Sequence, residues 1–225
     1  MSLSHKKDRV YHYYYFVFQS VCPYLFIKIY FLNFIFQFFL KLFLTFFVLA
    51  FSLFTHASEL SEKLQSSEYV LLMRHAWAPG VGDPANYSLD DCKTQRNLNA
   101  EGRAQAVSIG SWLRKQGVKN ADVYSSIWCR CKDTAALLNF GTYQVEPALA
   151  SFFDDMSKAK DSRRMLERFI AGKIKTKGNH ALIMVTHHVN ILEFMGENIG
   201  SGDMVLAKVN NKGELVSYKL IPSPE

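Results

Sequence analysis

The chain has 225 residues, of which 49% are hydrophobic and 20% charged, and its formal net charge at pH 7 is +6. Most of the positive charge lies in the first 57 residues, where Asp8 is the only acidic side chain, so the remainder is nearly neutral. A nearly neutral domain lacks the basic surface typical of nucleic-acid binding, and no nucleic-acid partner is expected.

The N-terminal quarter of the chain has the order of a targeting element. Lys41 precedes the apolar run LFLTFFVLAFSLF and then THA, an order typical of a signal peptide with a small-residue cleavage site. Cleavage is expected after Ala57, which separates a hydrophobic leader (1–57) from a folded domain (58–225). The alternative is a membrane anchor within residues 13–54. Both interpretations place the domain outside the cytoplasm, either exported to the periplasm or beyond, or held at a membrane.

The rest of the chain alternates between two hydrophobic periodicities. Apolar or alternating runs predict strands at 69–74, 121–126, 142–146, 180–186, 204–210 and 214–220. Helical spacing predicts helices at 99–117, 129–139, 161–172 and 189–199. Asn99 is the expected N-cap of the first helix, and Met165, Leu166 and Phe169 are expected on one side of the third. This order predicts an α/β fold: a three-layer α/β/α sandwich, with a mostly parallel sheet and helices on both faces.

Cysteine usage in the folded domain allows two interpretations. In an oxidising compartment Cys92 can pair with either Cys129 or Cys131. Three cysteines without a regular spacing are equally typical of buried free thiols. The sequence leaves the two possibilities open.

Two of the predicted strands end in histidine. The first runs into Arg74-His75, and the strand at 180–186 runs into His187-His188. Ligands of parallel α/β sheets bind beyond the carboxyl ends of the strands, so the two segments can deliver their histidines into one crevice.

An imidazole beside guanidinium groups suits phosphoryl transfer. Histidine is a nucleophile at neutral pH, and the arginine fork matches phosphate oxygens. A nearby arginine also disfavours protonation of the imidazole. We therefore expect His75 to attack a phosphate that Arg74, Arg130 and His187 surround, with Arg130 in the first turn of the helix at 129–139.

Over about 69–200 the sequence resembles the histidine phosphatase superfamily, in the branch related to phosphoglycerate mutases, and more specifically a group of small exported bacterial members. The motifs that carry the resemblance are RHA at 74–76, LNAEGRAQA at 98–106, SSIWCRCKDTA at 125–135 and IMVTHH at 183–188. It implies that His75 accepts the phosphoryl group and that Arg74, Arg130 and His187 complete the phosphate pocket. The implied activity is that of a histidine acid phosphatase-like phosphoric ester hydrolase, acting on a small phosphorylated substrate without cofactor or metal.

The chain departs from the family pattern where the general acid should be. Ser151 stands in place of the glutamate of an L-x-E motif, and His188 stands where the phytase-like branch has aspartate. Asp154 and its neighbour Asp155 can both reach the crevice, and Asp154 is the first candidate acid. Asp83 is the alternative, and His188 is a further candidate. Alternatively, the substrate has a leaving group good enough to need little acid help.

Other functions are compatible with the same motifs. The missing carboxylate favours a non-catalytic phosphate-binding or membrane-anchored interaction domain of the same fold, and transfer to an acceptor other than water is a third possibility. A zinc site of His75, His187, His188 and a cysteine has neither HxxEH nor CxxC spacing, so no metal is expected.

Overall fold

A computed structural model describes residues 31–45 and 58–224, which belong to two units treated separately here. Residues 31–45 are helical, and their large apolar side chains are exposed. Within the described ranges no helix combines the length and the apolarity needed to cross a membrane. Most of the predicted signal peptide or anchor lies outside the described residues.

The folded domain is built on a six-stranded sheet with the order β3-β2-β4-β1-β5-β6. Neighbours from β3 to β1 are parallel, and β5 and β6 each run antiparallel to the preceding strand in that order. The strands are β1 (Tyr69–Arg74), β2 (Ala121–Ser125), β3 (Tyr143–Val145), β4 (Ala181–Thr186), β5 (Met204–Val209) and β6 (Leu215–Ile221). Every strand lies within one or two residues of a predicted one.

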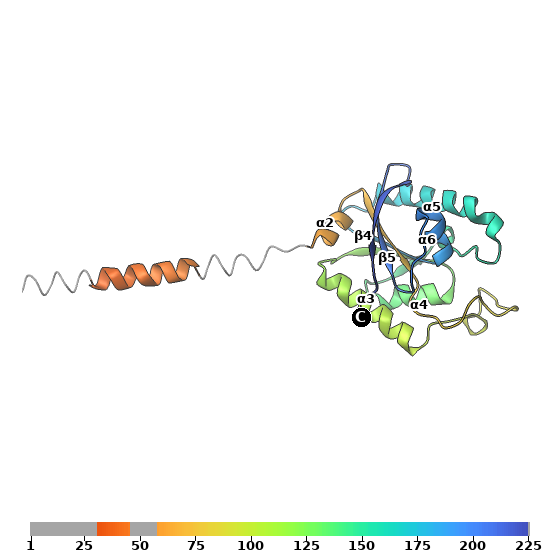
Figure 1. Ribbon diagram of the computed structural model, residues 1–225, viewed down its shortest axis with the longest axis horizontal. Helices are drawn as coiled ribbons and strands as arrows, with labels where there is room; N and C mark the ends of the chain where they lie inside the picture. The colour runs from red at the N-terminus through yellow and green to blue at the C-terminus, as the bar shows by residue number, and fades with distance from the viewer. Residues whose placement is uncertain (1–30, 46–57, 225) are drawn as a thin grey trace, which may run out of the picture. The chain divides into compact units, whose positions relative to one another are not determined.

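Helices cover both faces of this sheet (Figure 1). One face packs against α2 (Glu59–Gln65), α3 (Ala100–Lys115) and α4 (Cys129–Leu137). The other packs against α5 (Ala159–Ile174) and α6 (His188–Met195). Short 3₁₀ helices lie at η1 (Cys92–Thr94), η2 (Pro147–Leu149) and η3 (Met156–Lys158).

Alternation along β1 shows how the two cores form. Leu71 and Met73 belong to the core under α2, α3 and α4, whereas Val70 and Leu72 belong to the core under α5 and α6. Successive side chains of a strand point to opposite faces, so a continuous apolar run is what a strand covered on both sides requires. The predicted three-layer α/β/α fold is confirmed.

The N-cap predicted for α3 is confirmed, whereas Met165 does not share the buried side of α5 with Leu166. The Asn99 side chain accepts a hydrogen bond from the Gly102 N–H at 2.8 Å, so this N-cap is confirmed. In α5 the buried residues are Leu166, Ile170 and Ile174, whereas Met165 is 41% exposed. The helix continues beyond the predicted end at residue 172, and Ile174 completes an apolar stripe that Met165 does not join.

The centre of the sheet positions the candidate site. β1 and β4 are adjacent and parallel, and the His75 N–H donates to the Thr186 carbonyl at 3.0 Å, just past the end of β1. This bond continues the pairing of the two strands to the residues where both histidines follow, so His75 and His187 lie next to each other.

Candidate active site

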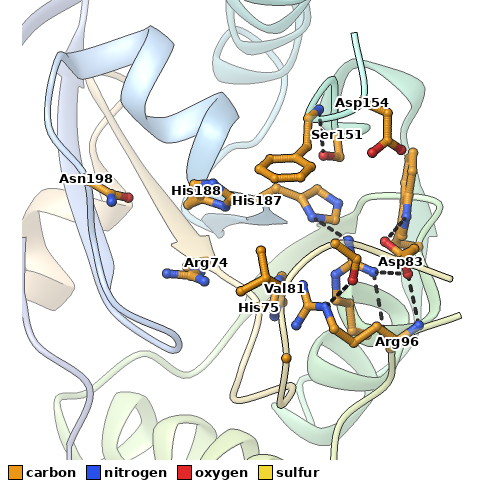
Figure 2. Close-up of a pocket in the computed structure, with 15 residues that line it drawn as sticks. Arg74, His75, Val81, Asp83, Arg96, Ser151, Asp154, His187, His188 and Asn198 are labelled. Carbon is orange, nitrogen blue, oxygen red and sulfur yellow. Dashed lines mark hydrogen bonds and ion pairs between the residues drawn. The ribbon is translucent and has the colours of Figure 1, made fainter. Parts of the chain in front are cut away.

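The histidines and arginines predicted for the site line one cavity of about 210 Å³ at the carboxyl ends of β1, β2 and β4. Figure 2 shows this cavity with the side chains around it. Its lining includes every predicted site residue: Arg74, His75, Asp83, Arg130, Asp154, His187 and His188.

His75 lies at the base of the cavity with only 1% of its surface exposed. Its Nδ1 is 2.8 Å from the Ala76 carbonyl oxygen, and because a carbonyl only accepts, Nδ1 carries the proton. Nε2 therefore carries the lone pair in the neutral ring. Burial holds the pKa of His75 well below its ordinary value, and the charges of Arg130, Arg74 and Arg96 lower it further. The imidazole is therefore neutral and able to attack through Nε2.

His187 faces His75 across the cavity, with their ring centroids 5.5 Å apart. Its Nδ1 is 3.4 Å from Arg130 Nη2 and its Nε2 is 2.8 Å from the Ser126 hydroxyl oxygen. Because guanidinium only donates, Nδ1 accepts and Nε2 carries the proton. The pKa of His187 is also held well below its ordinary value, mainly by burial and then by Arg130.

Three arginines, Arg74, Arg96 and Arg130, bring positive charge to the cavity. Arg74 uses Nη1 to donate to the Ile199 carbonyl at 2.8 Å, and Arg130 is only 3% exposed. The Nε atoms of both are buried without a hydrogen-bond partner. Buried donors are almost always paired in proteins, so two unpaired guanidinium nitrogens here are what an anion would satisfy.

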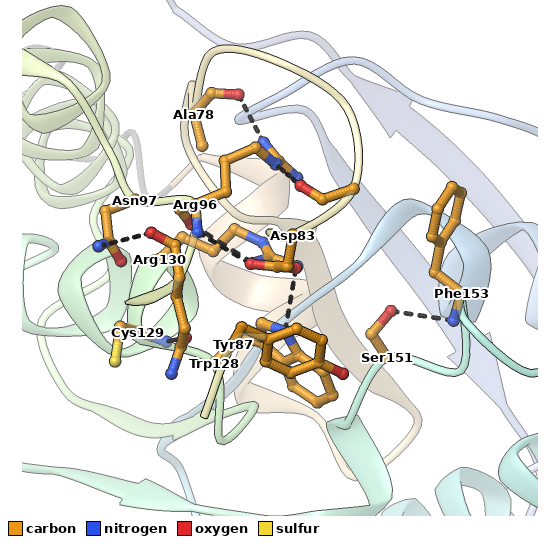
Figure 3. A network of polar contacts seen from close by, with 12 residues as sticks. Ala78, Asp83, Tyr87, Arg96, Asn97, Trp128, Cys129, Arg130, Ser151 and Phe153 are labelled. Carbon is orange, nitrogen blue, oxygen red and sulfur yellow. Dashed lines mark hydrogen bonds and ion pairs between the residues drawn. The ribbon is translucent and has the colours of Figure 1, made fainter. Parts of the chain in front are cut away.

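Asp83, which was predicted as the alternative acid, brings an opposing charge into the cavity. Its Oδ1 accepts from Arg130 Nη1 at 3.0 Å and from the Arg96 N–H at 2.9 Å, and its Oδ2 accepts from Trp128 Nε1 at 3.3 Å. Figure 3 shows this network around the carboxylate. Both oxygens act as acceptors, so this arrangement gives Asp83 the role of an anchor for Arg130 and not of a proton donor.

Residues 70–168 match the family model described as "Histidine phosphatase superfamily (branch 1)". This match covers 99 of the 225 residues and includes His75 and Arg130. No curated protein matches the sequence.

Several solved structures share the fold of this domain, although their sequence identity to it is low. A mycobacterial glucosyl-3-phosphoglycerate phosphatase in complex with VO3 aligns at 16% identity and a TM-score of 0.51, over 68% of this chain and 97% of that chain. A protein described as mycobacterial hydrolase 1 aligns at 15% identity and a TM-score of 0.50, covering 69% and 98% of the two chains. An open reading frame product of Mycobacterium tuberculosis aligns at 14% identity and a TM-score of 0.50, covering 68% and 95%.

Three further residues of the sequence motifs at 98–106 and 125–135 hold the segment that follows His75. Thr134 Oγ1 accepts from the Ala76 N–H at 3.1 Å, and Gln105 Oε1 accepts from the Trp77 N–H at 2.8 Å. At Gly102 an added Cβ would lie 1.8 Å from the Trp77 carbonyl oxygen. The glycine is therefore needed for close approach of α3 to this segment, and the three residues together fix the backbone behind the histidine.

The other two candidate acids, Asp154 and His188, lie on different segments around the cavity. Asp154 is exposed at the cavity, and its Oδ2 accepts from the Tyr87 hydroxyl at 2.9 Å. His188 is the first residue of α6, one position before the predicted start at 189, and its ring is 5.6 Å from that of Phe153. Burial and then the nearby arginines, Arg74 first, lower the pKa of His188.

Arg96 was missed in the sequence because it lies in a long loop without periodicity. Its Nε donates to the Gly82 carbonyl at 2.7 Å and its Nη1 to the Ala78 carbonyl at 2.5 Å, so it holds the loop that carries Asp83. The signal that could have found it is its place directly before the motif at 98–106, beside a loop rich in glycine and proline. Ser126 and Trp128 were likewise given no role, although both contact His187.

The cysteine alternatives are resolved by a disulfide between Cys92 and Cys129. Cys131 is free and buried, and burial raises the pKa of its thiol to about 12. The disulfide joins the loop after β1 to the residue directly before Arg130. It therefore ties the Asp83 loop to the helix that supplies Arg130.

Proposed function

We propose that this domain is a phosphatase that hydrolyses a small phosphomonoester or related phosphate through a phosphohistidine at His75. The observation that carries the proposal is the state of His75: buried, neutral, and bound through Nδ1 to its neighbour's carbonyl, which leaves Nε2 to attack. The match of residues 70–168 to the histidine phosphatase superfamily supports the same activity.

Side chains that line the cavity can act as the nucleophile and can stabilise the phosphoryl group during its transfer. Nε2 of His75 attacks phosphorus, the bond from phosphorus to the leaving oxygen breaks, and that oxygen takes up a proton. Arg74, Arg130 and His187 would stabilise the charge on the equatorial oxygens during this in-line displacement. Water then attacks the phosphohistidine, the phosphorus–nitrogen bond breaks, and inorganic phosphate leaves with His75 restored.

One observation favours the alternative of a non-catalytic phosphate-binding domain. Asp83 already neutralises Arg130 within the cavity, and both side chains are buried, at 6% and 4% exposure. A dianionic phosphate would have to share Arg130 with this carboxylate. The alternative differs from the phosphatase in one measurable respect, because a binding domain forms no phosphoenzyme.

The same proposal includes a location outside the cytoplasm, either after export or at a membrane surface. The Cys92–Cys129 disulfide supports it, since disulfides persist in oxidising compartments. The order of charged, apolar and small residues at 41–57 supports it as well. Detection of the mature N-terminus after expression in a bacterial host would test whether cleavage follows Ala57.

The proposed activity is tested by phosphate release from p-nitrophenyl phosphate, a substrate whose leaving group needs little help from an acid. We expect the purified protein to release phosphate in water alone, and His75→Ala to abolish the release. Formation of p-nitrophenol only in the presence of an acceptor alcohol, with the phosphoryl group on that alcohol and no inorganic phosphate released, would indicate a transferase. No release from this substrate or from a panel of phosphoanhydrides would favour the binding domain.

A further inference from the structure

The proposed chemistry requires a proton for the leaving oxygen, and both carboxylates that supply it in the related branches are replaced here, by Ser151 and His188. In an in-line displacement the leaving group lies opposite the nucleophile. His75 is 1% exposed at the base of the cavity, so the leaving oxygen lies at the open side. The acid must therefore come from a residue of the rim.

The other rim candidates fail on chemistry. Ser151 offers only a hydroxyl, and its oxygen accepts from the Phe153 N–H at 3.2 Å. Burial and three arginines disfavour the protonated form of His188 and lower its pKa, and its ring lies 5.6 Å from that of Phe153. Both oxygens of Asp83 accept hydrogen bonds, and one of them is paired with Arg130.

Asp154 is the carboxyl group that has one oxygen free for this work. Its Oδ2 accepts from Tyr87, whereas its Oδ1 has no hydrogen bond in the described structure. The residue is exposed and lines the same cavity as His75. Figure 2 shows Asp154 on the Ser151 side of the cavity, where the usual acid of the related mutases is missing.

Tyr87 fixes the orientation of this carboxyl group. The ring of Tyr87 packs against that of Trp128, with centroids 6.2 Å apart, and Trp128 is in turn bound to Asp83. Tyr87 therefore links the loop after β1 to the loop that carries Asp154, and Figure 3 shows its ring beside Trp128 and Asp83. The pKa of the Tyr87 phenol is raised, first by burial and then by its bond to Asp154, so the phenol keeps its proton.

From these contacts we infer that Asp154 is the general acid of the proposed phosphatase and that Tyr87 is its positioning residue. The inference rests on the proposed function. As the phosphorus–oxygen bond breaks, its electron pair stays on the leaving oxygen and Asp154 Oδ1 gives that oxygen its proton. The carboxylate that results accepts the Tyr87 hydroxyl at Oδ2. In the second step it takes the proton from the attacking water, while the electron pair of the phosphorus–nitrogen bond returns to His75.

The experiment compares two substrates that differ in leaving group. The full chain and its variants are assayed with p-nitrophenyl phosphate, whose leaving oxygen needs little protonation, and with glycerol 2-phosphate, whose leaving oxygen needs it. The comparison uses kcat/KM, which reports the steps up to loss of the leaving group and not the later hydrolysis of the phosphohistidine. For Asp154→Asn we expect kcat/KM for glycerol 2-phosphate to fall by about 10²-fold or more, and kcat/KM for p-nitrophenyl phosphate to fall by a much smaller factor. Asp154→Glu should recover part of the loss.

Tyr87→Phe should lower kcat/KM for glycerol 2-phosphate relative to kcat/KM for p-nitrophenyl phosphate, as Asp154→Asn does, but by a smaller factor. A structural role for Tyr87 would instead reduce both activities alike. The matched control is Asp155→Asn, which removes the adjacent carboxylate, whose bonds are to Ser157 and Lys158 outside the cavity lining. Its ratio of the two activities should equal that of the wild type.

The outcomes separate the two proposals. An Asp154→Asn variant whose kcat/KM falls equally for both substrates, or for neither, would overturn the assignment of the acid and leave the phosphatase standing. A wild-type protein that releases phosphate from neither substrate would overturn both.

Discussion

The Asp83 carboxylate lies 3.0 Å from Nη1 of Arg130, and both side chains are almost completely buried. This ion pair joins the loop after β1 to the first turn of α4. It also sets the charge of the cavity, because it offsets one of the cations that would hold a phosphate.

Asp83→Asn should therefore reduce stability and improve phosphate binding together. Removing one partner of a buried pair leaves the other charge uncompensated, and we expect a loss of about 3 kcal/mol in the free energy of unfolding. Inorganic phosphate should raise the melting temperature more in the variant than in the wild type, because it binds the native state without a competing carboxylate. Thermal unfolding with and without phosphate measures both effects.

The control for this variant is Asp133→Asn. Asp133 pairs with Arg103 at 2.6 Å, but the two side chains are 40% and 51% exposed, so the loss should stay below about 1 kcal/mol. A phosphate response in Asp83→Asn no larger than in the wild type would show that the carboxylate does not compete with the anion.

Reduction of the Cys92–Cys129 disulfide should loosen the same loop. The bond spans a sequence separation of 37 residues, and loss of a cross-link of this length is expected to cost about 4 kcal/mol of stability. Denaturant unfolding with and without a reductant measures the change. The double variant Cys92→Ser, Cys129→Ser should be as unstable as the reduced protein and insensitive to the reductant; equal stability of all forms would contradict this account.

The buried histidines should make stability depend on pH in a defined direction. The pKa of His75 is well below its ordinary value of 6.5 in the folded state, so below about pH 6.5 the unfolded chain binds a proton that the folded chain does not. The contribution is present above that pH and is lost as the pH falls, at about 1.4 kcal/mol per pH unit for one histidine. His75→Asn should flatten the decline between pH 6 and 4.5 by that amount, and parallel curves would contradict the burial of a neutral ring.

The approach of α3 to the segment after His75 gives a prediction on glycine. Gly102→Ala should lose about 1–3 kcal/mol, because the new methyl group would overlap the Trp77 carbonyl and force the backbone behind His75 to move. Gly172→Ala is the matched control, since it also lies within a helix but has open space around it, and it should gain up to about 1 kcal/mol. Chemical denaturation of both variants decides between close packing and a general effect of helix propensity.

The sequence predicted the elements whose signal is local. The strand at 180–186 is a continuous apolar run that only a buried strand explains, and Asn99 caps its helix through the next turn of chain. The meeting of His75 with His187 also followed, because the carboxyl ends of parallel strands share one edge. These inferences needed only periodicity and topology.

The rest depended on contacts that no local pattern encodes. Asp83 and Arg130 are separated by 47 positions, and Tyr87 and Asp154 by 67, and both pairs join loops whose path is set by the whole fold. Asp83 was predicted as an alternative acid because its loop follows His75, yet it pairs with Arg130. Met165 was grouped on one side of its helix with Leu166 and Phe169, yet it is exposed, because the buried stripe of α5 runs through Leu166, Ile170 and Ile174.

The central claim is that His75 carries the phosphoryl group, and the direct test is to find it there. The protein is quenched during turnover of p-nitrophenyl phosphate and the peptide that contains residue 75 is examined by mass spectrometry. The account predicts a phosphoryl group on His75, absent in His75→Ala and retained in His180→Ala, a variant of the exposed histidine that pairs with Asp122. Continued hydrolysis with no phosphoryl group on His75, or with the group on another residue, would contradict it.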